Sequence, residues 1–211
     1  MSGISDDMRI SKSSKLITFS LVALALVAML FIAQSSCPTR GITLSAEKEA
    51  FVRRKNSAAL PQEADFDGRV RLETLLQPLD DRGRWAEARA VAVEGYVVGV
   101  GAGGIEAANC FSPLRRDTHL YLSTKRDALP RERLVAEVTP RIRDWARQHG
   151  RDWSEAALRR ELSGRWCRVE GWLLFDREHA EEAENTAPGR AGNWRATAWE
   201  IHPVTNIEVL R

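Results

Sequence analysis

The sequence predicts a mainly β domain with helices, preceded by one apolar segment at the N-terminus. Five segments are rich in β-branched and aromatic residues, and glycine, proline and polar residues separate them, which is typical of short strands. A stretch with helical periodicity stands between the third and the fourth of these segments. The expected succession is therefore three strands, a helical region and two strands.

The apolar segment covers residues 16–33, contains no charged side chain and follows a basic tail. It is long for the core of a signal peptide, roughly 7–15 residues, and just long enough for a membrane span of about 17–25. We expect an uncleaved transmembrane helix or signal anchor over 16–34, with residues 1–15 as a cytoplasmic tail. A signal peptide cleaved near Ala33 and a lipoprotein modified at Cys37 are the alternatives.

The part of the chain after this segment is long, and long domains are translocated largely regardless of their charge. We therefore expect a single-pass membrane protein whose C-terminal domain is extracytoplasmic. Residues 35–68 are interpreted as a juxtamembrane linker with a short helix capped by Ser45, since serine is a favoured N-cap. The folded domain is expected over 69–211.

The first expected strand, 90–100, contains Gly95 and Gly99, and glycine inside a long strand commonly marks a bulge or a sharp bend. Residues 118–123 and 133–138 are the second and third strands. Residues 99–104 also spell GxGxxG, but no packing helix follows. A dinucleotide site needs that helix, so we expect a flexible loop there.

Thr139 and Pro140 predict a helix start, because threonine caps a helix and proline suits its first position. This helix is expected to end near Gly150, and Ser154 begins a second one. Residues 165–175 and 195–210 complete the strands, the last being bent at Pro203. This is the order of the five-stranded Greek-key OB barrel, whose helix lies between strands three and four.

Composition narrows the function classes. Apolar residues make up 44% of the chain and charged residues 28%, as in a soluble globular protein. The net charge of +2 gives no strong nucleic-acid signature, and we expect a monomer. Cys110 and Cys167 would lie in an oxidising compartment. A disulfide between them is one interpretation, and a buried thiol at Cys167 is the other.

The candidate chemistry centres on histidine, because three of the four histidines have a carboxylate in register. An acid beside an imidazole can orient it, raise its pKa or share a metal with it. In two of the pairs the spacing of two residues along a strand places both side chains on one face. Structural hydrogen-bonded pairs are the alternative. The candidate catalytic residues are Asp117, His119, Asp176, His179, Glu200 and His202.

Four further residues are candidate ligand-binding groups: Asn109, Glu137, Asn193 and Arg195. The spacing identifies no metal, since neither HExxH nor an HxH pair is present, and the cofactor stays unknown. Trp166, Trp172 and Trp199 lie on expected strands, where exposed aromatic rings can stack on bases or sugars and buried ones pack the core. Trp199 has the opposite parity from Glu200.

Several short motifs are similar to those of a group of bacterial, mostly exported proteins of unassigned function. The similarity covers about residues 66–210. The group has a strand-rich body that ends in a Glu-aliphatic-His-Pro-Val motif, and its members often carry Gly-Gln-Thr-Gly where Ala180 and its successors stand here. The resemblance implies the fold outline and carries no activity. Its motifs are Asn109-Cys110, Asp117-Thr-His119, Glu137-Val-Thr-Pro140, the segment 171–179 and Trp199-Glu-Ile-His-Pro-Val204.

Two functions remain in competition, and the sequence leaves open whether the chain is an enzyme. The first is a membrane-anchored, extracytoplasmic OB-like binding or accessory module with an unknown ligand. The second is a hydrolase of phosphodiester or glycan bonds that uses the acid–histidine cluster with or without a metal. A structural envelope protein is the third interpretation. Convergence of His119, His179 and His202 in space separates a single site from scattered pairs.

Overall fold

The computed structural model describes residues 37–211, of which Thr39–Arg211 form one compact unit. The expected membrane segment 16–34 lies outside the described residues. Among residues 37–211, no helix combines the length and the apolar character that crossing a membrane requires. The fold below is that of the unit 39–211.

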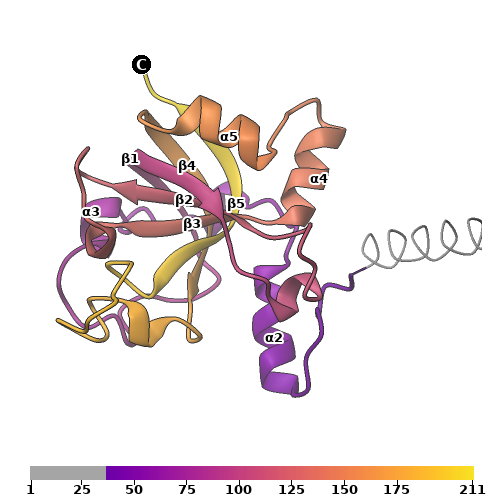
Figure 1. The fold of residues 1–211 in the computed structure, drawn as a ribbon, viewed down its shortest axis with the longest axis horizontal. Coiled ribbons are helices and arrows are strands. Elements are labelled where there is room, and N and C mark those ends of the chain that lie inside the picture. The colour runs from indigo at the N-terminus through magenta and orange to yellow at the C-terminus, as the bar shows by residue number, and fades with distance from the viewer. Residues whose placement is uncertain (1–36) are drawn as a thin grey trace, which may run out of the picture. The chain divides into compact units, whose positions relative to one another are not determined.

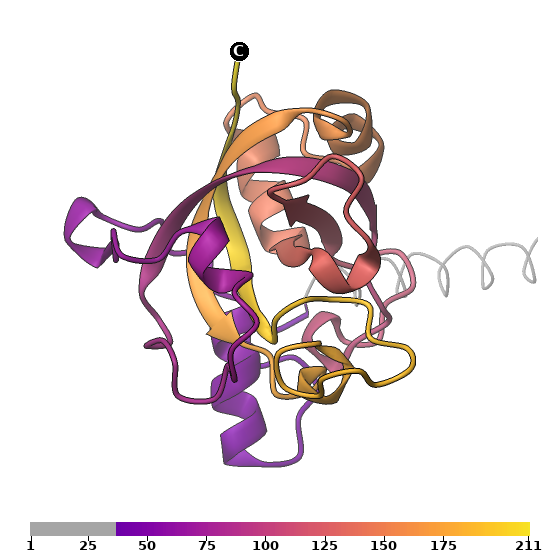
Figure 2. The same ribbon diagram turned by 90° about the vertical axis from the view of Figure 1, so that its left-hand side faces the viewer.

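Five strands close into a barrel in the order β1-β2-β3-β5-β4 (Figures 1 and 2). Strand β3 pairs with β5 in parallel, and the other neighbours are antiparallel. This closed mixed barrel is consistent with the OB-like fold predicted from the order of elements. The strands are β1 Ala90–Ala102, β2 Thr118–Ser123, β3 Leu134–Val138, β4 Trp166–Phe175 and β5 Trp199–Val209.

Helices α4 and α5 lie between β3 and β4, as predicted, and Figure 1 shows them at one end of the barrel. Thr139 caps α4 by accepting from the Ile142 amide, and Ser154 caps α5 by accepting from the Ala157 amide. The helices are α2 Ala46–Lys55, α3 Leu72–Leu75, α4 Pro140–Gln148 and α5 Glu155–Leu162. Short 3₁₀ turns are η1 Glu63–Asp65, η2 Ala107–Asn109, η3 Pro130–Glu132 and η4 Ala180–Glu182.

Helix α2 belongs to the compact unit, although the sequence analysis assigns its residues to a linker. Ser45 caps it as expected, by accepting a hydrogen bond from the Lys48 amide. Its residues Phe51, Val52 and Lys55 are buried. Two of them are apolar, so burial is expected for them, but a lysine with 1% exposure needs a partner inside the protein.

The barrel interior is filled by apolar side chains from alternate positions of every strand. On β5, Trp199 and Ile201 belong to this core, so Glu200 and His202 point to the opposite, outer face. On β2 and β3 the same alternation sends His119 outward, opposite Glu137, its register partner. The polar outer face of β2, β3 and β5 is therefore where the predicted acid–histidine residues gather.

Two irregularities adjust the barrel. The register of β1 shifts between Val97 and Gly99, which confirms the bulge predicted from the glycines. The register between β4 and β5 shifts around Gly171, opposite the cis His202–Pro203 peptide. A Cβ at Gly171 would overlap the Pro203 carbonyl oxygen, so only glycine lets β5 approach this closely.

The structure corrects two strand boundaries and decides between the alternatives for Cys167 and for the tryptophans. Strand β1 continues to Ala102, so much of the expected flexible loop 99–104 is strand, and β5 begins at Trp199 rather than at residue 195. Cys167 is a free, buried thiol, so the Cys110–Cys167 disulfide is wrong and the buried-thiol interpretation is confirmed. Trp199 packs in the core, whereas Trp166 is exposed.

Candidate functional site

The polar cluster starts at the β2–β3 register pair. His119 and Glu137 face each other across the two strands, with 3.1 Å between His119 Nε2 and Glu137 Oε1. The spacing of two residues along the chain predicts Asp117 as the partner of His119 instead. The Asp117 carboxylate accepts a hydrogen bond from the Asn109 side-chain amide at 3.0 Å, and this amide belongs to the turn η2. The acid beside His119 is therefore Glu137.

Strand β5 supplies the next pair. The His202 Nδ1 atom lies 3.0 Å from Glu200 Oε1, as the spacing of two residues predicts. The same Nδ1 lies 3.2 Å from Glu137 Oε2, which links β5 to the β2–β3 pair. One imidazole thus lies between two carboxylates from different strands, and its exposure is only 1%.

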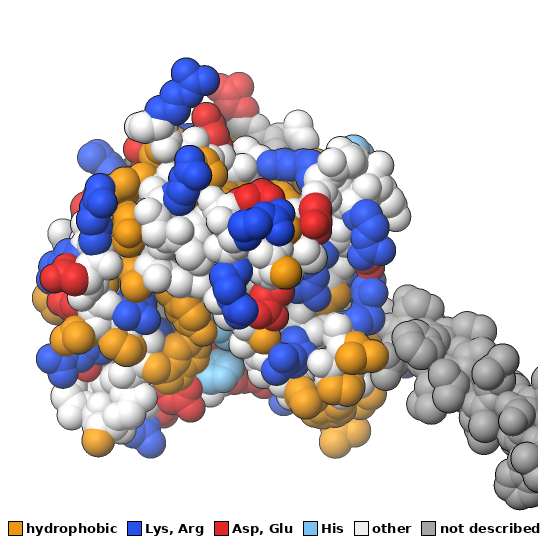
Figure 3. Space-filling view, turned by 45° about the horizontal axis from the view of Figure 1, so that its top comes forward, with side chains coloured by type: hydrophobic (Ala, Val, Ile, Leu, Met, Phe, Trp, Pro, Cys, Tyr) orange, Lys and Arg blue, Asp and Glu red, His pale blue; other side chains and the backbone are white. Residues whose placement is uncertain are grey.

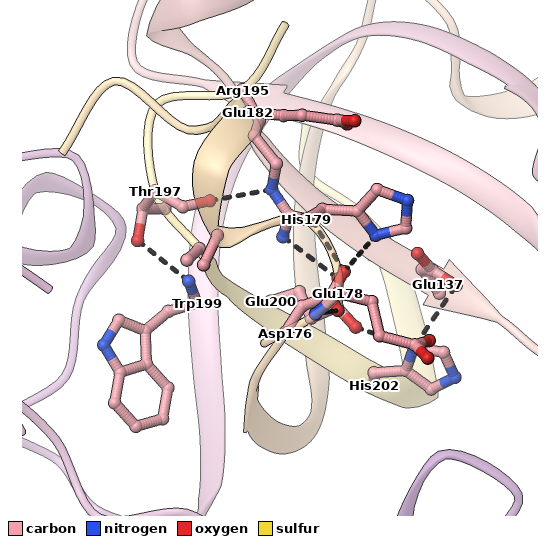
Figure 4. A network of polar contacts seen from close by, with 12 residues as sticks. Glu137, Asp176, Glu178, His179, Glu182, Arg195, Thr197, Trp199, Glu200 and His202 are labelled. Carbon is pink, nitrogen blue, oxygen red and sulfur yellow. Dashed lines mark hydrogen bonds and ion pairs between the residues drawn. The ribbon is translucent and has the colours of Figure 1, made fainter. Parts of the chain in front are cut away.

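The third pair lies after β4. His179 Nδ1 is 2.6 Å from Asp176 Oδ2, and the same oxygen accepts from Arg195 Nη1 at 3.0 Å. Arg195 Nη2 donates to Glu200 Oε2 at 3.0 Å, so this guanidinium joins the third pair to the second. Figure 4 shows the part of this network from Glu137 to His179. The order of the whole network is His119, Glu137, His202, Glu200, Arg195, Asp176 and His179.

Asp81 anchors the β4–β5 connection that carries Arg195. One carboxylate oxygen of Asp81 accepts from the Thr197 hydroxyl at 2.7 Å and from the Ala198 amide at 2.8 Å. The carbonyl of Thr197 in turn accepts from Arg195 Nε at 2.8 Å. Arg195, with no exposed surface, therefore has its guanidinium fixed by the fold before any ligand arrives.

Lys55 brings a further cation to the cluster. Its ammonium donates to Glu106 at 3.0 Å and is almost completely buried. Burial opposes its charge, but the carboxylates Glu137 and Glu106 outweigh that cost and raise its pKa well above the ordinary value. Sequence reasoning missed Lys55. Two features of the sequence point to Lys55: lysine is rare in this chain, which has only five, and Lys55 lies on the same side of α2 as its buried apolar residues.

Three predicted site residues lie outside the network: Asn109 and Asp117 form a pair of their own, and Asn193 belongs to a loop. The Asn193 amide donates at 2.8 Å to Glu184 and at 2.8 Å to the Ala187 carbonyl, so it closes a loop of the β4–β5 connection. Its neighbour Trp194, which the sequence analysis does not single out, contacts the site. The Trp194 ring stacks on His119 with a centroid separation of 6.2 Å and meets His179 edge-on at 5.8 Å.

Exposure is confined to one edge of the site. The His179 side chain is 34% exposed and Trp194 is partly exposed, whereas Asp117, Glu137, Glu200 and His202 are at most 3% exposed. Figure 3 shows histidine and acidic atoms in a hollow between two lobes of the surface. A separate pocket of about 260 Å³ between the residues after α2 and β4 has His202 in its lining.

The electrostatics separate the carboxylates into two groups. Burial alone would raise the pKa of Glu137, but His119 and His202 lower it well below its ordinary value. Asp176 is likewise buried, and the His179 hydrogen bond and Arg195 bring its pKa below the ordinary range. Burial and the charge of Glu137 raise the pKa of Asp117 to about 6. Burial together with Asp176 raises that of Glu200.

The pKa values of His179 and His202, which contact these carboxylates, are both raised. Burial disfavours the His202 imidazolium, yet Glu137 and Glu200 raise its pKa to about 9. The hydrogen bond that His179 donates to Asp176 raises the pKa of His179 to about 9, against a smaller effect of burial. Without another cation, the network therefore balances its carboxylates with protonated imidazoles at neutral pH.

Four buried atoms of this site make no hydrogen bond within residues 37–211, and two of them have only an ion-pair contact, Glu137 Oε2 to His202 and His119 Nε2 to Glu137. The four atoms are Asp117 Oδ1, Glu137 Oε2, His202 Nε2 and His119 Nε2. One ligand atom each from Asp117, Glu137 and His202 lies within 4.8 Å of the others, a spacing that suits a metal ion. Comparisons with protein-family models, curated proteins and solved structures find no significant match to this chain.

Proposed function

We propose that this chain is an extracytoplasmic OB-like binding module, anchored in a membrane by residues 16–34, and that its ligand site is the acid–histidine network. The observation that carries the proposal is the convergence of the predicted acid–histidine residues in space. Three acid–histidine pairs, one across β2 and β3, one on β5 and one after β4, meet in one connected cluster. The anchor rests on the apolar segment, and membership of the exported group rests on its short motifs.

The cost of the network supports a functional role. Buried charges are expensive, and replacing buried ion pairs with apolar residues is often neutral or stabilising. A barrel of this size has an apolar core of its own and does not need a second, charged cluster to fold. Groups kept under such a cost commonly mark a site. The burial of most of the network also favours binding over hydrolysis, because a polymeric ligand can reach only its exposed edge at His179 and Trp194.

The exposed edge defines what a ligand touches first. Trp194 offers an aromatic face beside the cationic His179, a combination that suits a sugar ring or a nucleobase next to an anionic group. A ligand bound there lies over His119, the next ring of the stack. The ligand class of the proposal is therefore an oligosaccharide or an oligonucleotide carrying negative charge.

The test uses the full chain in detergent, immobilised and screened against glycan and oligonucleotide panels. We expect a ligand whose affinity falls at least about 10-fold in Trp194→Ala, since stacking contributes about 1–3 kcal/mol per ring. Trp166→Ala is the matched control, because Trp166 is exposed on β4 and has no contact with the network. Binding that weakens with salt identifies phosphate as the recognised group. Equal loss in both variants, or no ligand at all, contradicts the proposal.

A hydrolase is the second candidate, favoured by the direct contact of His202 with Glu200, whose pKa is raised, and with Glu137, whose pKa is lowered. In this alternative His179, at the exposed edge, is the proton donor to a leaving group. It predicts turnover of a phosphodiester such as bis-p-nitrophenyl phosphate, or of a glycan, that is lost in His179→Gln. Binding without turnover under the same conditions leaves the module as the function.

A further inference from the structure

The three residues Asp117, Glu137 and His202 are each fixed through one polar atom and leave another one without a hydrogen bond. Asn109 holds Asp117 Oδ2, and Oδ1 is unpartnered among the described residues. His119 lies against Glu137 Oε1, whereas Oε2 makes no hydrogen bond and has only an ion-pair contact, at 3.2 Å from His202 Nδ1. Buried polar atoms in folded proteins nearly always have a partner, so three together call for an explanation.

The histidine follows the same pattern. Glu200 contacts His202 Nδ1 at 3.0 Å, which leaves Nε2 as the nitrogen available to another group. A carboxylate on one ring nitrogen is the usual outer partner of a histidine that binds a metal through the other nitrogen. Arg195 fixes Glu200 in turn, so the orientation of the His202 ring is set by two successive contacts.

Charge compensation points to the same three residues. Lys55 pairs with Glu106, and Arg195 pairs with both Asp176 and Glu200. Within residues 37–211, Asp117 and Glu137 form no ion pair with a lysine or an arginine. The two carboxylates of this site that lack a permanent cationic partner are thus the two that place an oxygen within 4.8 Å of one another and of a His202 ring nitrogen.

We propose that Asp117, Glu137 and His202 bind one divalent transition-metal ion, with Zn²⁺ and Mn²⁺ as the fitting ions. Two carboxylate oxygens and one imidazole nitrogen suit these metals, whereas Ca²⁺ and Mg²⁺ prefer oxygen ligands alone. Two carboxylates neutralise the charge of the ion. Ligand atoms around an ion at about 2.1 Å lie roughly 3–4 Å apart, so separations within 4.8 Å need only small rotations.

This site deepens the proposed function, on which it rests, because the ion would lie inside the same network. Asn109, His119 and Glu200 then act as positioning residues that orient the three ligands. The remaining coordination positions are open to water or to an anionic group of the bound ligand. The metal would connect the buried part of the site with the ligand at the Trp194 edge.

The experiment is metal binding by the full chain in detergent, prepared without a polyhistidine tag. The chain is stripped with a chelator, dialysed against Zn²⁺, Mn²⁺ or Ca²⁺ separately, and its metal content is measured by mass spectrometry. We expect close to one Zn²⁺ or Mn²⁺ per chain, no stoichiometric Ca²⁺, and a melting temperature raised by the bound ion.

Variants locate the ion. His202→Gln should weaken binding at least about 100-fold, since loss of an outer partner alone costs 10–100-fold. His149→Gln is the matched control, because His149 is an exposed residue at the end of α4 that contacts Trp145. Asp117→Asn keeps the shape of the side chain and covers the case in which His202→Gln fails to fold. Its control is Asp144→Asn at the surface of α4.

Absence of stoichiometric metal in the wild-type chain overturns the inference, as does equal metal loss in His149→Gln and His202→Gln. These results are separate from the test of the binding module, in which ligand affinity is measured through Trp194. If chelator-treated chain still binds its ligand and takes up no metal, the metal site falls and the module stands.

Discussion

Replacing Arg195 with methionine tests the network at its most connected residue. The guanidinium is completely buried and makes three charge-assisted or backbone hydrogen bonds, to Asp176, Glu200 and the Thr197 carbonyl. Methionine keeps much of the side-chain volume and removes all three donors. The change therefore leaves two buried carboxylates without their shared cation.

The magnitude follows from those contacts. Removing one partner of a buried ion pair costs about 3–5 kcal/mol, because the other charge stays buried and uncompensated. We expect the free energy of unfolding to fall by about 4 kcal/mol. A domain of this size has a total of about 5–15 kcal/mol. With a urea m-value of about 2.5 kcal/mol per molar, the unfolding midpoint falls by about 1.6 M.

The assay is urea unfolding followed by tryptophan fluorescence, with Arg190→Met as the matched control. Arg190 lies in the same connection, is exposed, and pairs with the exposed Glu181. Exposed ion pairs contribute about 0–1 kcal/mol, so the control should stay within about 0.5 kcal/mol of wild type. Adding Glu200→Gln to Arg195→Met should recover about 1 kcal/mol, since it removes one uncompensated charge.

A loss below about 1 kcal/mol for Arg195→Met would refute this reasoning, because it would mean that the two carboxylates need no cation. A control variant that loses as much would also refute it. If the double variant is less stable than Arg195→Met alone, the uncompensated charge of Glu200 is not the cause of the stability loss.

Three further predictions concern other parts of the barrel. Gly171→Ala should lower the free energy of unfolding by at least about 2 kcal/mol in urea, because its Cβ overlaps β5, whereas Gly68→Ala, with open space around it, should be near neutral. Burial raises the pKa of Cys167 to about 11, so iodoacetamide at pH 8 should label this thiol only after denaturation, as mass spectrometry of its peptide would show; labelling of the native chain contradicts its burial. The pKa of His179 is raised to about 9, so its ion pair with Asp176 stabilises the fold fully below about pH 6.5 and progressively less up to pH 9. The stability difference between wild type and His179→Gln should shrink accordingly in urea unfolding at pH 6, 8 and 9.5, and a difference that grows with pH contradicts the assignment.

The sequence by itself determined the local elements of this protein. Alternation of β-branched residues identified the five strands, and Ser45, Thr139 and Ser154 predicted three helix starts at the right positions. These signals are readable because a cap or a strand pattern involves only residues close in the chain. The same local logic placed Glu200 and His202 on one face, which the 3.0 Å contact confirms.

Only the tertiary structure decided how the site is assembled. The partner of His119 is Glu137 on the neighbouring strand, and the partner of Asp117 is Asn109 across a loop. Arg195 joins two strands, and Lys55 comes from a helix assigned to a linker. The register between strands and the docking of α2 depend on closure of the whole barrel, which no local spacing encodes. Most residues of the network were therefore predictable from the sequence, whereas the pairs that they form depend on closure of the barrel.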